Sequence, residues 1–118
     1  MNSLIRDILS ARVYDVAKNT QLDHLYLLSQ QLKCDIWLKR EDLQPIFSFK
    51  IRGAFNRIFQ LSDEEKAKGV VCASAGNHAQ GVALSGLHLK LDTTIVMPTS
   101  APLLKVNACR EMGANVIL

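Results

Sequence analysis

Residues 70–81, VVCASAGNHAQG, decide the fold of this chain. The run from Val70 to Ala73 is short and apolar, which suits a strand buried on both faces of a parallel sheet. A turn containing Gly76 follows it, and a helix is expected from about Asn77 to Leu89. An apolar strand that leads through a tight turn into a helix is the first half of a βαβ unit.

The downstream sequence repeats this order. We expect a strand over Thr93–Met97, a helix that begins near Pro102 and ends at Gly113, and a last strand over Asn115–Leu118. Short connections between alternating strands and helices predict βαβ units in a parallel sheet, so the fold class is α/β.

The upstream sequence is less regular. Residues 22–32 carry leucines at helical spacing and predict a helix, and Cys34–Lys39 predicts a strand. Ser62-Asp63-Glu64-Glu65 is a capping box for a short helix that ends near Gly69. Another helix follows Ser48, because apolar residues recur every three or four positions at Ile51, Ala54, Phe55, Ile58 and Phe59.

Composition limits the function. The chain has 118 residues, 48% of them hydrophobic, and a net charge of +3 without long basic runs, which does not favour nucleic-acid or membrane binding. No apolar stretch approaches a membrane span of roughly 20 residues. Cys34, Cys72 and Cys109 are interpreted as buried free thiols, and no motif suggests a metal site. No targeting segment is recognised, which is compatible with a cytoplasmic protein.

The segment Ser48–Ala54 departs from the helix rules. Ser48 is a good N-cap, yet Lys50 and Arg52 occupy the first turn, where the helix dipole disfavours cations. A lysine held there between Phe49 and Ile51 is expected to lose its charge and act as a nucleophile. The alternative is a surface lysine whose stem packs while its head reaches water.

The turn Ser74–His78 suits an anion. Free N–H groups at the start of a helix bind carboxylates or phosphates, and Gly76 lets the backbone approach a ligand. Asn77 and His78 can add hydrogen bonds, although Asn77 is also a common N-cap and a single histidine is more often structural. His24 and His88, on predicted helices without polar neighbours, are interpreted as structural.

Two stretches resemble a known family. Lys39-Arg40-Glu41-Asp42-Leu43-Gln44-Pro45, which leads into Ser48-Phe49-Lys50-Ile51-Arg52-Gly53-Ala54, resembles the cofactor-lysine signature of threonine ammonia-lyases, also called threonine dehydratases or deaminases. Residues 73–83 resemble the substrate loop of that family, and the match continues to the C-terminus. The amino-acid sequence of residues 40–45 is more similar to the biosynthetic branch of the family. Serine racemase and cysteine synthase are more distant relatives with the same tryptophan-synthase-β-like, fold type II architecture.

The resemblance implies a role for each site residue. Lys50 would bind pyridoxal 5′-phosphate covalently and later act as the base at the substrate Cα. Phe49 would pack near the pyridine ring, and Asn77 would hydrogen-bond the ring hydroxyl. Ser74, Gly76 and His78, together with Asn77, would bind the substrate carboxylate. No metal is implied.

The resemblance also implies an activity and a domain division. The parent enzyme would deaminate L-threonine, and also L-serine, giving 2-oxobutanoate and ammonia from threonine in the first step of isoleucine biosynthesis. Residues 1–52 would belong to a larger cofactor domain, residues 53–118 would form most of a smaller α/β domain, and the full protein would be a homo-oligomer. One alternative function is that of a serine racemase or another β-elimination or β-replacement enzyme of the same fold. A second alternative is a non-catalytic remnant that binds small molecules.

Two departures from the family pattern matter. Thr20-Gln21-Leu22 replaces the usual Thr-Pro-Leu, and the six isolated glycines provide no glycine-rich loop for the cofactor phosphate. We therefore expect a fragment of a longer protein with little or no catalysis of its own.

Overall fold

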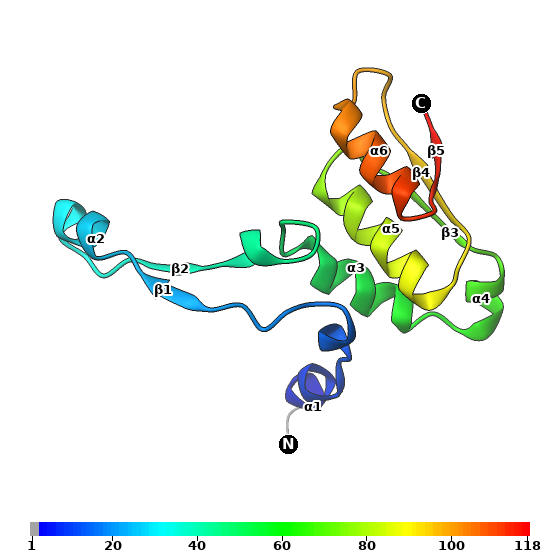
Figure 1. The fold of residues 1–118 in the computed structure, drawn as a ribbon. Coiled ribbons are helices and arrows are strands. Elements are labelled where there is room, and N and C mark those ends of the chain that lie inside the picture. The colour runs from blue at the N-terminus through cyan, green and yellow to red at the C-terminus, as the bar shows by residue number, and fades with distance from the viewer. Residues whose placement is uncertain (1–2) are drawn as a thin grey trace.

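The computed structural model describes residues 3–118 as a body and an extended arm (Figure 1). The elements in chain order are α1 (Ser3–Ser10), β1 (Leu22–His24), α2 (Tyr26–Leu32), β2 (Trp37–Lys39), α3 (Lys50–Phe59), α4 (Asp63–Ala67), β3 (Val70–Ala73), α5 (Asn77–Leu89), β4 (Thr93–Val96), α6 (Leu103–Glu111) and β5 (Asn115–Ile117). Single 3-10 turns lie at Val13–Asp15 and Glu41–Leu43. The arm consists of β1, α2 and β2, and the body of α3 to β5.

The body contains the expected parallel sheet. Its strand order is β3-β4-β5, with Cys72 opposite Ile95 and Ile95 opposite Val116. Alternation of β3, α5, β4, α6 and β5 along the chain confirms the α/β fold class. No helix among residues 3–118 has the length and hydropathy needed to cross a bilayer.

One face of this sheet is covered and the other is open. Ile95 and Cys109 are fully buried where α5 and α6 lie against the sheet (Figure 1). On the opposite face Val71 is 76% exposed, and Val96 and Ile117 are exposed as well. The expectation of strands buried on both faces is therefore wrong for the described residues, because side chains alternate along a strand and both helices pack on one side.

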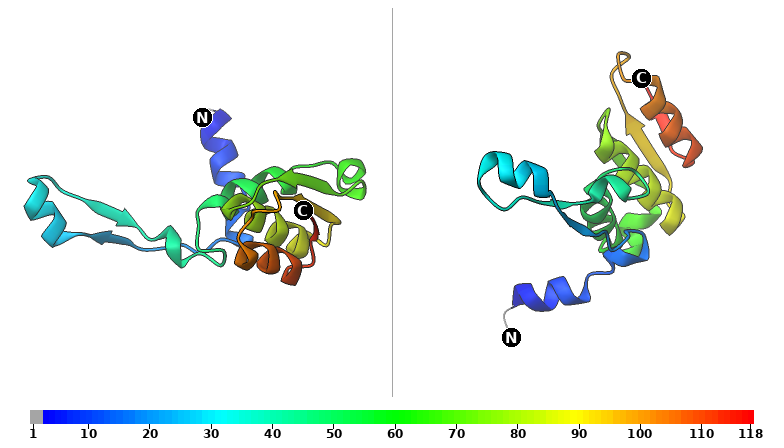
Figure 2. Two further views of the ribbon diagram at one scale, coloured as in Figure 1. Left: turned by 90° about the horizontal axis from the view of Figure 1, so that it is seen from above. Right: turned by 60° about the vertical axis from the view of Figure 1, so that its left-hand side comes forward.

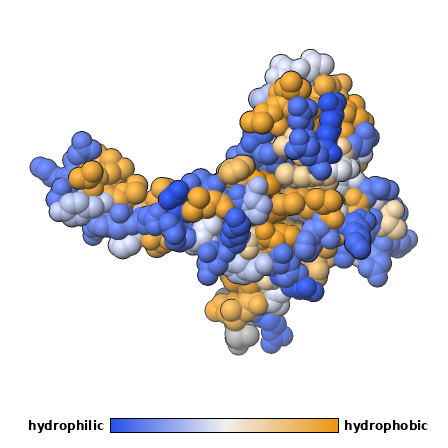
Figure 3. Space-filling view, in the orientation of Figure 1, coloured by the Kyte–Doolittle hydropathy of each residue, from blue (hydrophilic) through white to orange (hydrophobic). Residues whose placement is uncertain are grey.

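The arm corrects two further expectations. Residues 22–24 form a strand rather than the first turn of a helix, since β1 pairs antiparallel with β2 in the register Leu22 with Lys39. The Leu25 N–H donates to the Ile36 carbonyl at 2.9 Å, so the helix begins only at Tyr26. The second strand is correspondingly shorter than Cys34–Lys39. The arm leaves the body (Figure 2), and apolar side chains show on its surface (Figure 3).

Local signals define most element ends. Ser62 and Glu65 form the expected capping box, with Glu65 N–H to Ser62 Oγ at 3.2 Å and Ser62 N–H to Glu65 Oε2 at 2.8 Å. Gly69, with φ of +76°, reverses the chain beside Asp92, whose carbonyl oxygen would lie 2.7 Å from any Cβ at this position. Pro102 stands just before α6 rather than within it, and its carbonyl accepts the Lys105 N–H at 2.8 Å.

The three cysteines are free thiols, but they do not share one environment. Cys72 and Cys109 are buried as expected, and burial raises the pKa of both thiols. Cys34 is exposed on the arm, which corrects the expectation that all three are buried.

Candidate active site

Lys50 is the first residue of α3, and its side chain is exposed. Phe49 precedes it at the cap position with 58% of its surface exposed, and the Lys50 Nζ lies 5.0 Å from the centroid of the Phe49 ring. Ser48 is not the N-cap, although its Oγ accepts the Lys50 N–H at 3.3 Å. Within residues 3–118 no carboxylate forms an ion pair with Lys50. The exposure of the Lys50 side chain agrees with the alternative of a surface lysine, while the Ile51 side chain beside it is fully buried and holds the helix start in place.

The second cation of this helix turn has a partner that the sequence pattern did not indicate. Arg52 Nε donates to Glu41 Oε2 at 2.9 Å, and its Nη2 donates to Glu41 Oε1 and to the Lys18 carbonyl, both at 3.0 Å. A two-point arginine–carboxylate contact is stronger and better oriented than a simple ion pair. Arg52 is therefore compensated at the helix start, and the contact ties the Lys50 helix to the preceding chain.

Further donors complete this anchor around Glu41. Thr20 Oγ1 donates to Glu41 Oε1 at 2.6 Å, and the buried Gln44 donates to both carboxylate oxygens at 3.2 and 3.3 Å. The hydrogen bonds from Arg52, assisted by those from Thr20 and Gln44, lower the pKa of Glu41 to about 2. We call Thr20, Glu41, Gln44 and Arg52 the Glu41 clamp. Because all donors converge on one carboxylate, the clamp restricts the position of Lys50.

The turn before α5 presents free backbone donors. Ser74 Oγ accepts the Gly76 N–H at 3.4 Å, which shapes the turn, and Asn77 and His78 begin the helix. The N–H groups of Asn77, His78 and Ala79 have no acceptor among residues 3–118. Unpaired N–H groups at a helix N-terminus form an anion site. The geometry thus supports the expectation of a carboxylate- or phosphate-binding turn without testing which ligand it takes.

Gly81 joins the lysine to this turn. A Cβ at Gly81 would lie 3.1 Å from the Lys50 carbonyl oxygen and 3.3 Å from the Ala54 Cβ, so a larger residue would force α3 and α5 slightly apart. Asn77 is one helical turn before Gly81, about 6 Å along the axis of α5. Lys50 and the anion-binding turn are thereby brought to the same region, although they are 27 residues apart in sequence.

The Asn77 side chain contacts Lys105 of α6, which adds this lysine to the candidate site. Lys105 Nζ donates to Asn77 Oδ1 at 2.7 Å and to Gln80 Oε1 at 2.6 Å. The sequence pattern assigned no role to Lys105, because a lysine in the first turn of α6 looks like an ordinary surface residue. Only the packing of α6 on α5 shows that its ammonium group holds two amides.

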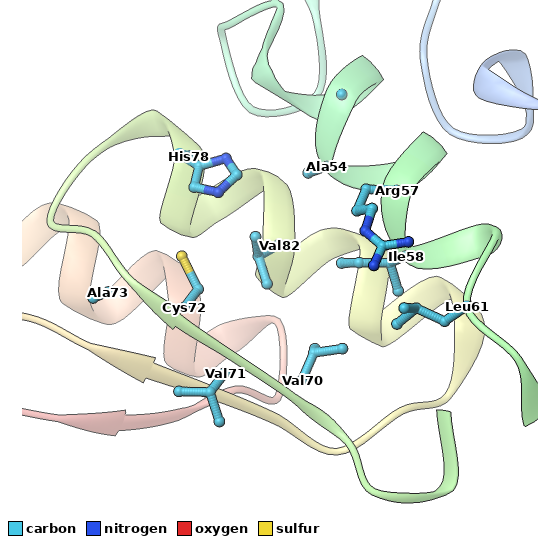
Figure 4. Close-up of a pocket in the computed structure, with 11 residues that line it drawn as sticks. Ala54, Arg57, Ile58, Leu61, Val70, Val71, Cys72, Ala73, His78 and Val82 are labelled. Atoms are coloured by element: carbon cyan, nitrogen blue, oxygen red, sulfur yellow. The ribbon is translucent and has the colours of Figure 1, made fainter. Parts of the chain in front are cut away.

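The His78 side chain has different neighbours from the Asn77 side chain. It lines a cavity of about 370 Å³ between α3, β3 and α5, where its ring lies close to Cys72 and Val82 (Figure 4). The other lining residues are mostly apolar, and they include neither Lys50 nor Asn77: Gly53, Ala54, Arg57, Ile58, Leu61, Val70, Val71 and Ala73. The structure therefore places the Lys50 backbone one turn of α5 from Asn77, whereas His78 lines a cavity that neither Lys50 nor Asn77 lines.

For His24 the expectation of a helix without polar neighbours is wrong, because it ends strand β1 and its Nε2 lies 3.3 Å from Ser29 Oγ and 3.5 Å from Asp35 Oδ1. Its ring lies 4.7 Å from the Trp37 ring between centroids, in a tilted arrangement. His88 meets the Phe55 ring edge-on at 5.5 Å.

Comparison with known proteins places this geometry in a family. The model of pyridoxal-phosphate dependent enzymes matches residues 13–118. A chloroplastic biosynthetic threonine dehydratase of Solanum lycopersicum is 54% identical over 114 residues, and a biosynthetic L-threonine dehydratase of Pasteurella multocida is 53% identical over 114 residues. Each alignment covers 97% of this chain but only 19% and 22% of the respective relative, so the chain spans about a fifth of their length.

Solved structures agree with the sequence matches. The processed form of threonine deaminase isoform 2 from Solanum lycopersicum superimposes with a TM-score of 0.91 at 50% identity, covering 98% of this chain and 32% of that one. Maize serine racemase superimposes with a TM-score of 0.89 at 36% identity, covering 96% and 35%. Because the family match extends over residues 13–118, the chain belongs to the family of pyridoxal-phosphate-dependent enzymes.

Proposed function

We propose that this chain carries the lysine and the carboxylate-binding turn of an ammonia-lyase that acts on L-threonine and also on L-serine. The observation that carries the proposal is the close contact of the Lys50 backbone with Gly81, which lies one helical turn from the open N-terminus of α5. The names of the similar dehydratases support threonine as the substrate.

The described residues fit one end of the cofactor. Lys50 would hold pyridoxal 5′-phosphate covalently, Phe49 would lie beside its ring, and the Asn77 amide would donate to the ring oxygen. The fit of Asn77 rests on its own contacts, because its carbonyl is already occupied by Lys105 and its N–H groups remain for a ligand. We assign no residue of this chain to the phosphate, since the described helix starts lack a glycine-rich turn of the kind that such a group needs.

The chain's own residues would bind the substrate and move a proton. Ser74, Gly76, Asn77 and His78 would hold the substrate carboxylate through the free N–H groups of the helix start. When bound, pyridoxal phosphate supplies delocalisation of the electrons left at Cα. The Lys50 amine would accept the Cα proton. Departure of the β-hydroxyl and addition of water then give 2-oxobutanoate and ammonia.

A second candidate is racemisation of serine, because maize serine racemase superimposes closely and is 36% identical. Both reactions begin with the same proton removal, so the residues described here do not separate them. Assay of products from L-serine distinguishes D-serine from pyruvate.

Three expectations remain predictions. The division at residue 52 falls inside α3, which continues unbroken to Phe59. The prediction that the full protein is a homo-oligomer is not tested by the contacts of the described residues. The cytoplasmic location also remains a prediction, because similar plant and yeast enzymes are named chloroplastic and mitochondrial.

Trapping the cofactor tests the lysine. The 118-residue chain is mixed with pyridoxal 5′-phosphate, reduced with borohydride and mapped by peptide mass spectrometry. We expect label on Lys50, loss of that label in Lys50→Ala and no change in Lys68→Ala, an exposed lysine at the end of α4. Label on other lysines at equal yield in the Lys50→Ala variant would show that the lysine assignment is wrong.

Activity is tested in a complete enzyme. This chain replaces the matching 114 residues of the tomato dehydratase, and release of 2-oxobutanoate from L-threonine is measured. We expect turnover in the chimera, none in its Lys50→Ala variant and none in the 118-residue chain alone. Rapid turnover by the isolated chain would refute the view that the remaining part of the enzyme is needed.

A further inference from the structure

We propose that Lys105 is a positioning residue that fixes the orientation of the Asn77 amide, so that Asn77 offers hydrogen-bond donors to the ring oxygen of the cofactor. The inference rests on the proposed function for the identity of that ligand. Its structural part rests on the contacts of Lys105 with Asn77 at 2.7 Å and with Gln80 at 2.6 Å.

The chemistry of the lysine head group determines which side of the amide it meets. An ammonium group has three donors and no acceptor, so it can contact the oxygen of an asparagine side chain but not the NH₂ group. With Oδ1 of Asn77 held toward α6, its NH₂ group is turned away from Lys105. Without this contact the amide can rotate by half a turn at little cost and present an acceptor instead. The negatively charged ring oxygen of the cofactor requires a hydrogen-bond donor, which only the NH₂ side of the Asn77 amide provides.

The position of Lys105 is itself well defined. Its side chain is partly buried on α6, and its second acceptor belongs to Gln80, which is only 6% exposed. Asn77 and Gln80 are three residues apart on α5 and therefore lie on the same helix face. Two acceptors on one face hold one ammonium group, and that group in turn holds the exposed amide of Asn77 in a single orientation.

The charge of Lys105 adds to this effect. Within residues 3–118 no carboxylate lies within ion-pair distance of its Nζ. A cation that has only neutral amide partners beside a helix N-terminus is unfavourable in the free chain. An anionic ligand at the same place removes that penalty, so Lys105 raises the preference of the site for the ionised form of the ring oxygen.

The first experiment observes the amide without any cofactor. Side-chain amide NMR of the 118-residue chain is recorded for the unaltered protein, Lys105→Met, Lys105→Arg and the control Lys68→Met. A hydrogen bond to Oδ1 strengthens the double-bond character of the amide C–N bond, so rotation of the Asn77 NH₂ group should be slow in the unaltered chain and in Lys105→Arg. We expect faster rotation in Lys105→Met only. Equal rotation in all four proteins would overturn the proposal.

The second experiment adds pyridoxal 5′-phosphate and records the absorption spectrum and the rate of cofactor loss before reduction. In Lys105→Met we expect the long-wavelength band of the Lys50 adduct to weaken and the cofactor to be lost about tenfold faster, the effect of one lost charge-assisted hydrogen bond. Lys105→Arg should restore much of both, because a guanidinium group also only donates.

Asn77→Asp separates positioning from support of the fold. The aspartate keeps a contact with Lys105 and so keeps α5 tied to α6, but it has no N–H to donate. Because its carboxylate pairs with Lys105 at the start of α5, we expect it to unfold at a temperature no lower than that of the unaltered chain and to show the spectral change of Lys105→Met. An unaltered spectrum in Lys105→Met, or lower thermal stability as its only change, would mean a structural tether and would contradict the proposal. Absence of label on Lys50 in every protein would instead count against the proposed function, and the NMR result would still decide the role of Lys105.

Discussion

The strongest stability prediction concerns the carboxylate of Glu41. Four hydrogen bonds shorter than 3.3 Å reach it from Thr20, Gln44 and both donor positions of Arg52. Its side chain is 15% exposed and that of Arg52 is 24% exposed, so water screens the pair only in part. The pKa of Glu41 falls from 4.5 to about 2 for this reason. Replacement of the carboxylate in Glu41→Gln removes the charge and leaves Arg52 without its partner.

The size of the effect follows from the pKa. A difference of about 2.5 units, taken from 4.5 and about 2, corresponds to about 3 kcal/mol at 1.36 kcal/mol per unit. Because the pKa of the folded state is the lower one, this stabilisation is present above pH 4.5 and is lost as the pH falls toward 2. At pH 7 we therefore expect Glu41→Gln to lower the free energy of unfolding by about 3 kcal/mol. Near pH 2 the two proteins should differ much less.

Urea denaturation followed by circular dichroism at several pH values measures this difference. Asp42→Asn serves as the matched control, because Asp42 is a neighbouring carboxylate that pairs with Arg40 at 2.8 Å but is 56% exposed. We expect a smaller loss for the control. A Glu41→Gln effect that stays constant from pH 7 to pH 2, or that equals the control, would refute the reasoning from the clamp.

Two further predictions concern close packing and thiol access. Gly81→Ala should destabilise the chain by about 1–3 kcal/mol, because the added Cβ would lie 3.1 Å from the Lys50 carbonyl oxygen. Gly53→Ala, a helical glycine with nothing within 4 Å of an added Cβ, should instead stabilise it by about 0.5–1 kcal/mol, and equal melting temperatures for the two variants would contradict both expectations. A colorimetric thiol reagent should modify Cys34 in the native chain, and Cys72 and Cys109 only after unfolding, since burial protects both and raises their pKa. Three fast-reacting thiols under native conditions would argue against this core.

Local patterns predicted the body of the protein well. The strands β3 and β4, the helix α5 and the capping box of α4 lie where apolar runs, glycines and Ser62 indicated. These elements are set by interactions between residues close in sequence, which a single sequence displays directly. Lys50 was singled out as the candidate lysine mainly by the family resemblance, since its departure from the dipole rule at a helix start also fits an ordinary surface lysine.

The errors arose where distant segments decide the conformation. Leu22–His24 has leucine spacing that suits a helix, yet its backbone pairs with Trp37–Lys39. The same holds for burial, since the apolar run of β3 indicated two covered faces, while Val71 remains 76% exposed with the helices on one side. Neither the pairing nor the layering is encoded in the local period of hydrophobic residues.

The sequence by itself determined the order of strands and helices from α3 to β5 and the family resemblance, and it predicted Lys50 and the turn before α5 as the candidate site. The tertiary structure decided what surrounds them. Glu41 explains the second cation in the first turn of α3, Gly81 brings the Lys50 backbone against α5, and Lys105 orients Asn77 from another helix. The physical reason is the same in each case. These contacts join residues 11 to 31 positions apart, and hydrogen-bond geometry and close approach between such residues exist only after the helices have packed.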